Sequence, residues 1–455
     1  MSGLSGILEA AKRAMQSQRF GINVASHNIA NASTPGFSRQ RVLLEPSLAL
    51  RTQAGMLGTG VQATHIGRIR ERFIDQQIRL ANDSFGEAEI KYRITGQIES
   101  IFNEPSEAGL SAALGRFFNS FQDLATHPEE SSSRNAVLQQ GLLLTQSFNR
   151  LSTGLHQLRD DLTNEVNVKV NRINELTKEI SRLDIEITNT QAKGLEPADL
   201  KDQRDLLIDE LSKLANIHAS EDSNGSVLIS LGGTVIASRA GAVTLRAEGD
   251  GSTISIINEL NGRAMNITGG ELHGVLSMYN KEVPDFLDRL DQLAAEILER
   301  VNEVHAGGYG IGDPPTTGIS FFEGTNAGNI RVNEAIVNDI MNIAASADGT
   351  SGNNANALAL SDIPDELLFN DNRLSVNQFY NAIVSDIGSR INSNESIIRS
   401  QTMVLNQLEH QRASVSGVSI DEEMTNLIKY QRAYEASARV VRTVDEMFQS
   451  IINMV

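Results

Sequence analysis

Residues 151–187, LSTGLHQLRDDLTNEVNVKVNRINELTKEISRLDIEI, decide the fold class of this chain. Apolar side chains recur there every three or four positions, which is the period of an amphipathic α-helix. The stripe consists of Leu151, Leu155, Leu158, Leu162, Val166, Val170, Ile173, Leu176, Ile180, Leu183 and Ile187. We therefore expect one long helix from about residue 131 to about residue 190.

A second helix is expected to return along the first. Gly194 and Pro197 interrupt the helical pattern and predict a turn. The periodic pattern then resumes at Leu200, Leu207, Ile208, Leu211 and Leu214. The two segments predict an antiparallel helical hairpin.

Further helices are predicted at residues 271–305 and 375–414. Ser375 and Gln378 have the spacing of a capping box, in which each residue satisfies a free backbone N–H group at the helix start. With the hairpin, these segments predict a mainly α protein built as a long antiparallel helical bundle.

Residues 216–270 differ in kind from the helices around them. The runs GSVLISLGGTVIAS and STISIINELNG are rich in Val, Ile, Thr and Gly, with turn residues at short intervals. We expect a small β domain inserted between helices. Residues 307–371 are rich in Gly, Asn and Asp and predict loops, part of which could join the β domain.

Both ends of the chain carry the narrow apolar seam of a coiled-coil helix, with steps of four and three residues. The C-terminal helix has a marked start, because Gly417 precedes a capping-box pattern formed by Ser419 and Glu422. The N-terminal seam runs through Leu4, Leu8, Ala11, Met15, Gln18, Ile22, Ala25 and Ile29. The C-terminal seam runs through Ile420, Met424, Leu427, Gln431, Tyr434, Ala438, Val441, Phe448, Ile452 and Val455.

Neither terminal helix buries its seam by itself, so each needs a partner stripe. We expect the two ends to be mobile in the isolated monomer and to become ordered in an assembly. The predicted domains are a terminal coiled-coil assembly domain (1–60 and 416–455), a central helical bundle (61–215 and 271–415) and the inserted β domain (216–270).

Composition argues against several classes of function. The formal net charge of -18 argues against a nucleic-acid partner, because phosphate recognition needs a basic surface. Arg68, Arg70, Arg72 and Arg79 form a local basic cluster, which we interpret as a solvated helix face rather than a phosphate site.

Cysteine is absent from the sequence, which excludes disulfides and Cys-bound metals. The first residues, MSGLSGILEAAKRAMQ, lack the apolar core of a signal peptide. No run of about 18 apolar residues predicts a membrane span. We therefore expect no membrane insertion, and if the protein leaves the cytoplasm, it must use a route without a cleaved signal peptide.

No motif in the sequence indicates catalysis. The eight histidines never have the i, i+4 spacing that lets two imidazoles share a metal on one helix face. The loop GGYGIGD at residues 307–313 follows a helix and precedes prolines, which is the wrong context for a phosphate-binding loop. We expect no catalytic residue, no cofactor and no metal site.

Residues 26–40, SHNIANASTPGFSRQ, resemble the N-terminal signature of the rod, hook and hook-associated axial proteins of the bacterial flagellum. Ser33 and Phe37 stand where that signature has Asn and Tyr. Residues 416–454, SGVSIDEEMTNLIKYQRAYEASARVVRTVDEMFQSIINM, resemble the C-terminal segment of the same family. Within this family, the chain is most similar to the hook-associated members. The features that indicate this are the Ser-Arg-Gln ending of the signature, the helical hairpin and the β insert.

The resemblance implies a structural role. Copies of the chain would form a ring between hook and filament, contacting the hook protein on one side and another hook-associated protein on the filament side. It also implies unfolded export through the flagellar type III pathway and an export chaperone bound at about residues 420–455. The alternatives are a hook or distal rod protein with a mainly β middle, a flagellum-associated cell-wall hydrolase, and a helical signalling or adhesion protein.

The signature also has a physical interpretation. Asn31 can cap the first helix, Pro35 disfavours helix at the residue before it, and Gly36 permits a sharp change of direction. We expect the turn to redirect the chain from an inner coiled-coil layer to an outer layer. The expected assembly interface comprises Leu4, Leu8, Met15, Ile22, Asn28, Ile29, Asn31, Pro35, Gly36 and Phe37, together with Met424, Leu427, Tyr430, Tyr434, Ala438, Val441, Phe448 and Ile452.

Overall fold

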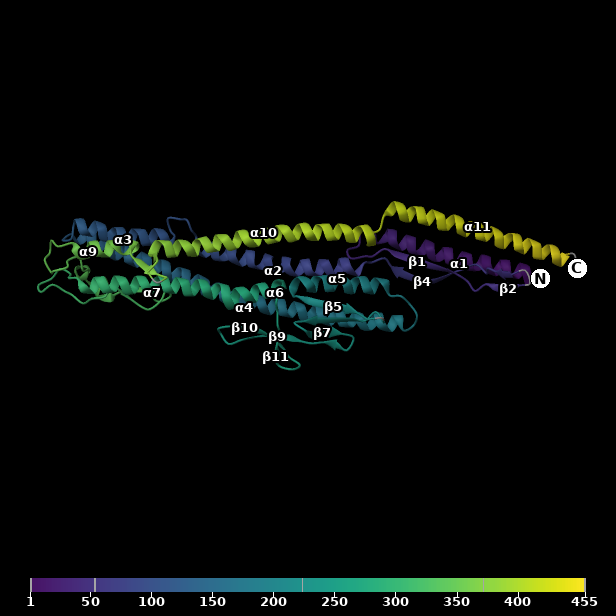
Figure 1. Cartoon of the computed structure of the whole chain (residues 1–455), viewed down its shortest axis with the longest axis horizontal. Helices are drawn as coiled ribbons and strands as arrows, with labels where there is room; N and C mark the ends of the chain where they lie inside the picture. The colour runs from purple at the N-terminus through teal and green to yellow at the C-terminus, as the bar shows by residue number, and fades with distance from the viewer. Residues whose placement is uncertain (1, 53–54, 223, 371, 454–455) are drawn as a thin grey trace.

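The protein is a long rod in which helices run along the main axis (Figure 1). The computed structural model describes residues 2–52, 55–222, 224–370 and 372–453. Both termini lie at one end of the rod, and a helical bundle with a β insert on its side forms the rest (Figure 1). The predicted fold class, a mainly α bundle with terminal coiled-coil helices and a small inserted β domain, is confirmed.

The predicted helical hairpin forms the middle of the bundle. Helix α4 (Ser131–Gln191) and helix α5 (Ala198–Leu214) are joined by a turn in which Gly194 has a φ of 78°. Only glycine adopts such a positive φ without strain. The apolar stripe that predicts α4 is buried from Leu151 to Ile187, because α5, the other helices and the β insert cover it.

Five more helical segments complete the bundle. Helix α10 starts with the predicted capping box, since Ser375 Oγ accepts a bond from Gln378 N and Gln378 Oε1 accepts one from Ser375 N. It lies alongside α2 (Figure 1). The segments are α2 (Arg72–Phe102), α3 (Leu110–Thr126), α6 (Gly270–Ser277), which continues through a π-helical turn (Met278–Glu282), α7 (Val283–Gly307) and α10 (Val376–Ser416).

The β insert consists of two antiparallel sheets on the side of α4 (Figure 1). Their alternate side chains, such as Ile229, Leu231 and Ile256, are buried in the same core as the α4 stripe. The first sheet contains β5 (Ile217–Glu221), β6 (Val227–Leu231), β7 (Thr234–Ser238) and β8 (Gly241–Ala242), and the second contains β9 (Leu245–Gly249), β10 (Ile254–Asn258) and β11 (Arg263–Ala264).

The loop-rich segment after α7 packs against α3 and α7, at the end of the rod far from the termini (Figure 1). The β insert lies at mid-rod, so the two segments are apart. The loop-rich segment contains β12 (Phe322–Glu323), β13 (Arg331–Val332), α8 (Glu334–Asn338), a 3-10 turn (Ile340–Asn342), α9 (Ala355–Asp362), a second 3-10 turn (Ile363–Asp365), β14 (Leu367–Phe369) and β15 (Leu374–Ser375).

At the other end, α1 (Ser2–Ala30) and α11 (Ile420–Asn453) lie side by side (Figure 1). A β-hairpin that the sequence patterns did not predict runs back along α1. Strand β1 (Gln40–Pro46) pairs with β4 (Val61–Arg68), and β2 (Leu50–Thr52) pairs with β3 (Gly55–Leu57) nearer the tip. The hairpin therefore crosses the boundary expected at residue 60. Val455, the last residue of the predicted seam, lies outside the described residues.

Candidate assembly interface

Helices α1 and α11 form an antiparallel pair. The ring of Tyr430 lies directly on Gly21, so close that a β-carbon at that position would be 2.8 Å from three ring atoms. One heptad along each helix, Asn28 contacts Glu423. The two contacts are seven residues apart on both helices, which is the spacing of a regular coiled-coil register.

Most residues of the expected interface on the two terminal helices are only half-buried in the monomer. This holds for Leu4, Leu8, Met15, Ile22 and Ile29 on α1, and for Leu427, Tyr430, Tyr434, Ala438, Val441 and Phe448 on α11. Met424 and Ile452 are 45% and 70% exposed. The buried face of α1 instead carries small residues, Ala11, Ser17, Gly21, Val24 and Ala25, because α11 and the hairpin both approach it closely.

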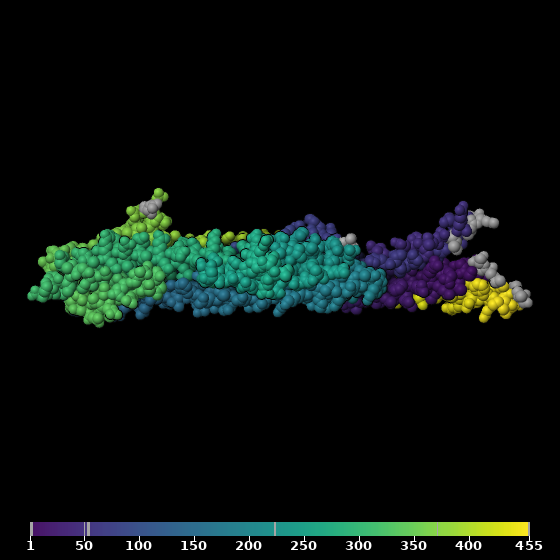
Figure 2. Space-filling view, turned by 90° about the horizontal axis from the view of Figure 1, so that it is seen from below, coloured from purple at the N-terminus to yellow at the C-terminus, as the bar shows by residue number. Residues whose placement is uncertain are grey.

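Other apolar side chains at this end of the molecule are exposed. Leu48 is 93% exposed beside the hairpin tip, and Figure 2 shows the hairpin projecting from the same end as α11. Contiguous exposed apolar residues on a folded chain commonly mark an interaction site. The others are Ile7, Phe20, Leu43, Leu44, Met56, Leu57, Ile420, Ile428, Val440, Met447 and Ile451.

The signature turn has the predicted geometry. Helix α1 ends at Ala30, where the side chain of Asn31 donates to His27 O at 3.0 Å. Gly36 has a φ of 76°, as expected for the change of direction. Pro35 and Gly36 are exposed, and the ring of Phe37 meets the imidazole of His27 edge-on.

The last residues of the signature attach this turn to the central bundle. Both Ser38 N and Ser38 Oγ donate to the carboxylate of Asp202 on α5, at 2.9 and 2.7 Å. The Gln40 side chain donates to Asp199, also on α5, at 2.7 Å. The sequence motif is therefore a joint between the terminal helices and α5.

The interpretation of the arginine cluster as a solvated face is wrong for Arg68, Arg70 and Arg79. Arg68 donates to Asp202 and Asp205 at 2.7 and 2.9 Å, with only 11% of its side chain exposed. Sequence alone could not pair Arg68 and Arg79, because their partners lie more than a hundred residues away on α5. Arg72 is 74% exposed and pairs with Glu221, so the prediction holds for that residue alone.

The ion pairs of this cluster link three elements beside the joint. Arg70 forms a two-point contact with Asp75 at 2.7 and 3.1 Å, and Arg79 and Arg412 both contact Asp209. Burial by itself raises the pKa of Asp205, but the surrounding arginines outweigh it and lower that pKa. The carboxylate of Asp205 therefore stays charged, and with Asp202 and Asp209 it binds the arginines of α2, α10 and the β4–α2 segment to α5.

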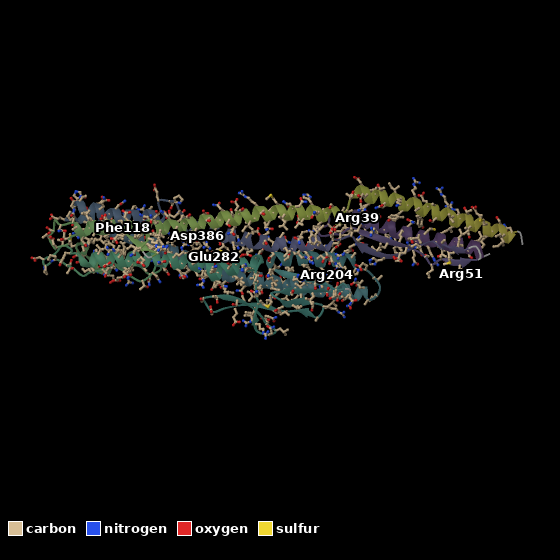
Figure 3. The ribbon with its side chains drawn as sticks, viewed as in Figure 1. Arg39, Arg51, Phe118, Arg204, Glu282 and Asp386 are labelled. Atoms are coloured by element: carbon tan, nitrogen blue, oxygen red, sulfur yellow. The ribbon has the colours of Figure 1, made fainter. Side chains whose placement is uncertain are left out.

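A buried polar cluster lies where the terminal helices meet the joint, and we call Asn28, Arg39, Gln40 and Glu423 the latch cluster. Glu423 is only 3% exposed, and its carboxylate accepts bonds from Asn28 at 2.9 Å and from Arg39 at 2.6 and 2.8 Å. Figure 3 places Arg39 at the step from α10 to α11. Sequence reasoning missed Arg39 and Glu423, although Glu423 lies one heptad before Tyr430, a residue of the expected interface.

The described residues contain no group of three or more His, Asp and Glu side chains able to hold a metal ion. Within the same residues, no helix is long and apolar enough to cross a membrane. The polar clusters that the structure does contain, such as Arg204 with Asp184 in the core beside the β insert (Figure 3), are salt bridges between packed elements.

Three family models match the chain. The flagellar hook-associated protein FlgK helical domain matches residues 95–322. The flagella basal body rod protein model matches residues 8–37, and the C-terminal model of the flagellar basal body rod FlgEFG proteins matches residues 410–454. The last two matches cover the signature segment as far as Phe37 and the whole of α11.

Individual relatives match over almost the whole chain. Flagellar hook-associated protein 1 of Bacillus subtilis is 33% identical, over 98% of this chain and 97% of its own length. The protein of the same name from Salmonella typhimurium is 24% identical over 99% of this chain and 100% of its own length.

The fold also matches a solved structure. The flagellar hook junction protein FlgK from Burkholderia pseudomallei superposes with a TM-score of 0.64 and 15% identity, over 75% of this chain and all of that chain. With the full-length identity to the Bacillus subtilis protein, the matching helical domain and the shared terminal segments, this chain belongs to the flagellar hook-associated protein 1 family.

Proposed function

We propose that this chain is a structural subunit of the bacterial flagellum, and that its copies form the ring that joins hook and filament. The observation that carries the proposal is the antiparallel α1–α11 pair, whose large apolar residues remain half-buried or exposed in the monomer. Covering them with sister copies removes apolar surface from water, which stabilises association. The names of the relatives support the same location.

The interface in this proposal is the set of seam residues expected from the sequence, together with the exposed apolar residues of the hairpin. The terminal helices with the hairpin form the assembly domain, the helices from α2 to α10 form the central bundle, and residues 216–270 form the insert. The bundle and insert would then lie outside the tube made by the assembly domains.

The partners proposed beyond sister copies are the hook protein on one side and a neighbouring hook-associated protein on the filament side. The chain reaches this extracellular place through the flagellar type III route, without a cleaved signal peptide. Before export, a chaperone covers α11, where Ile420, Met424 and Ile428 form an exposed apolar line at steps of four residues. The role is non-enzymatic.

The test is deletion of the gene for this chain in the flagellated host. The expected result is cells that build hooks but release filament subunits into the medium, because no junction holds the filament. Reintroducing the unaltered chain restores filaments, which is the control. Intact filaments in the deletion strain would argue against the proposal.

The hook and distal rod proteins are the nearest alternatives, because the terminal rod-protein models match here as well. The middle of the chain distinguishes the two cases. The resemblance led us to expect a mainly β middle in hook and rod proteins, whereas α2 to α10 are mostly helical and contain the matched helical domain. Within the flagellar axis, this favours the junction over hook or rod.

A further inference from the structure

Helix α11 begins with a buried carboxylate. Among its described residues, only Glu423 and Val444 are buried. A buried carboxylate is costly unless it is paired and hydrogen-bonded. Losing its partners therefore costs Glu423 more free energy than losing a partner costs a half-buried seam residue.

Each carboxylate oxygen of Glu423 has a partner from the opposite side of the joint. Oε1 accepts from Arg39 and Oε2 accepts from Asn28 Nδ2 at 2.9 Å. Asn28 is fully buried and is itself fixed by the backbone of Gln40, through bonds of 2.9 and 3.0 Å. The latch cluster is thus fully paired, and its geometry is set by the signature turn.

Arg39 also holds the residue that ends α10. Its backbone N donates to Ser416 O at 2.8 Å, and its side chain contacts Glu422 at 2.7 Å. Only residues 417–419 separate α10 from α11, and three residues span about 10 Å at most. While Arg39 holds Ser416, Glu423 can reach the Arg39 and Asn28 of its own chain.

The apolar contacts along the rest of the α1–α11 pair do not distinguish the α1 of the same chain from the α1 of a sister copy. These contacts are non-directional, and every sister copy presents the same stripe on α1. We propose that the latch cluster, with Glu423 at its centre, is the specificity determinant that keeps α11 on the α1 of its own chain. The inference rests on the proposed function, because a choice between α1 helices arises only among sister copies.

The natural absence of cysteine allows a direct test by cross-linking. A β-carbon at Gly21 would lie 2.8 Å from Tyr430 Cγ, so cysteines at these two positions have β-carbons within the roughly 3.5–4.5 Å that a disulfide needs. Gly21→Cys with Tyr430→Cys in one chain reports pairing within a chain. A mixture of one chain with Gly21→Cys and Tyr430→Ala, which avoids the clash of a β-carbon at position 21 with the Tyr430 ring, and a second chain with Tyr430→Cys reports pairing between chains.

The latch is then removed in both designs by Asn28→Leu with Glu423→Leu, which replaces the polar pair by apolar side chains. Purified chains at high concentration are oxidised and separated on a non-reducing gel. We expect at least a fivefold increase in the disulfide-linked dimer of the mixed chains over the intact latch. The matched control is Asp421→Leu, which changes an exposed carboxylate in the same first turn of α11 and leaves the dimer fraction unchanged.

An unchanged dimer fraction in the latch variant would overturn the inference, as would abundant dimers while the latch is intact. Glu423→Gln is the second variant, for use if the double leucine chain does not fold. It keeps the size of the side chain, removes the charge that pairs with Arg39, and is expected to raise the dimer fraction at least twofold. Filament retention in cells is scored separately, so that a failed latch and a failed junction role give different results.

Discussion

Gly21 illustrates how a single residue sets the spacing of two helices. Glycine in a helix costs up to about 1 kcal/mol relative to alanine. By helix propensity alone, Gly21→Ala would therefore stabilise α1 by up to about that amount. The added β-carbon, however, would lie 2.8 Å from the Cγ atom of Tyr430, near the base of its side chain. The helices must move apart, and overpacking of this kind costs about 1–3 kcal/mol.

We expect Gly21→Ala to weaken the α1–α11 pair, measured as faster amide exchange in α11. Gly6→Ala is the matched control, because within the described chain a β-carbon at Gly6 meets nothing within 4 Å. That change adds helix propensity alone and should slow exchange in α1. Equal effects of the two substitutions would contradict the close approach at Gly21.

Asp83 on α2 gives the central bundle a pH dependence. Burial, and then the nearby Glu87, raise the pKa of Asp83 from 3.8 to about 6, against the opposite effect of His273. A raised carboxyl pKa means that the folded state binds the proton more tightly. The penalty of the charged form is therefore fully present above pH 6 and disappears as the pH falls toward 4.

Asp83→Asn should raise the free energy of unfolding by about 1 kcal/mol at pH 7.5, a value discounted for partial exposure of the carboxylate. At pH 4 the variant and the unaltered chain should be equally stable. Thermal unfolding at the two pH values measures the difference. Glu87→Gln is the contrasting change, since Lys91 and His273 outweigh burial and lower the pKa of Glu87 to about 2, and its loss should destabilise the chain at pH 7.5.

At the scale of elements, the terminal helix pair is the part whose function depends most on neighbours. Leu427→Ala or Tyr434→Ala removes a half-buried side chain, so each site contributes about 1–2 kcal/mol when sister copies cover it. We expect roughly a tenfold loss of ring affinity per site. The melting temperature of the central bundle should change little.

Filament retention in cells and thermal unfolding of the purified chain measure these two effects. Met403→Ala on α10 is the control, because it removes a side chain that is 67% exposed and lies outside the terminal pair. Normal junctions combined with a destabilised bundle would show that the terminal seam residues act inside the monomer instead.

The elements differ in how far sequence predicts them. The α4 stripe is continuous and each of its residues is buried, so the pattern alone predicts α4 and its return through α5. The sequence pattern does not predict the hairpin of β1 and β4. Its strands contact α1 on one side only, and apolar residues such as Leu43 and Leu44 remain exposed, so no clean alternation appears in the sequence.

For the whole molecule, the main hydrophobic core does not extend into the terminal helices. The core cluster spans buried residues from Ile90 to Ile387 and includes the β insert. Among the described residues, it contains none from α1, the hairpin or α11. The terminal region is attached to the rest by the polar joint, the β4–α2 connection and the α10–α11 connection.

We therefore expect the terminal region to open independently of the bundle. In a dilute monomer, amide exchange in α1 and α11 should be at least about 100-fold faster than in α4, because local opening leaves the core intact. Assembly into rings should slow exchange in both terminal helices. Strong protection of both helices in the dilute monomer would rule out this expectation.

The sequence by itself determined the helices whose apolar period is long, the location of the β insert, the turn at Asn31 to Gly36 and the family resemblance at both ends. These features are local, since backbone geometry and side-chain period act over a few residues. Tertiary structure alone decided that Arg68, Arg70 and Arg79 pair with α5, that Gly21 receives Tyr430, and that Glu423 is buried against Asn28 and Arg39. Those contacts join residues more than a hundred positions apart, and a buried charge is stable only where the fold places its partner.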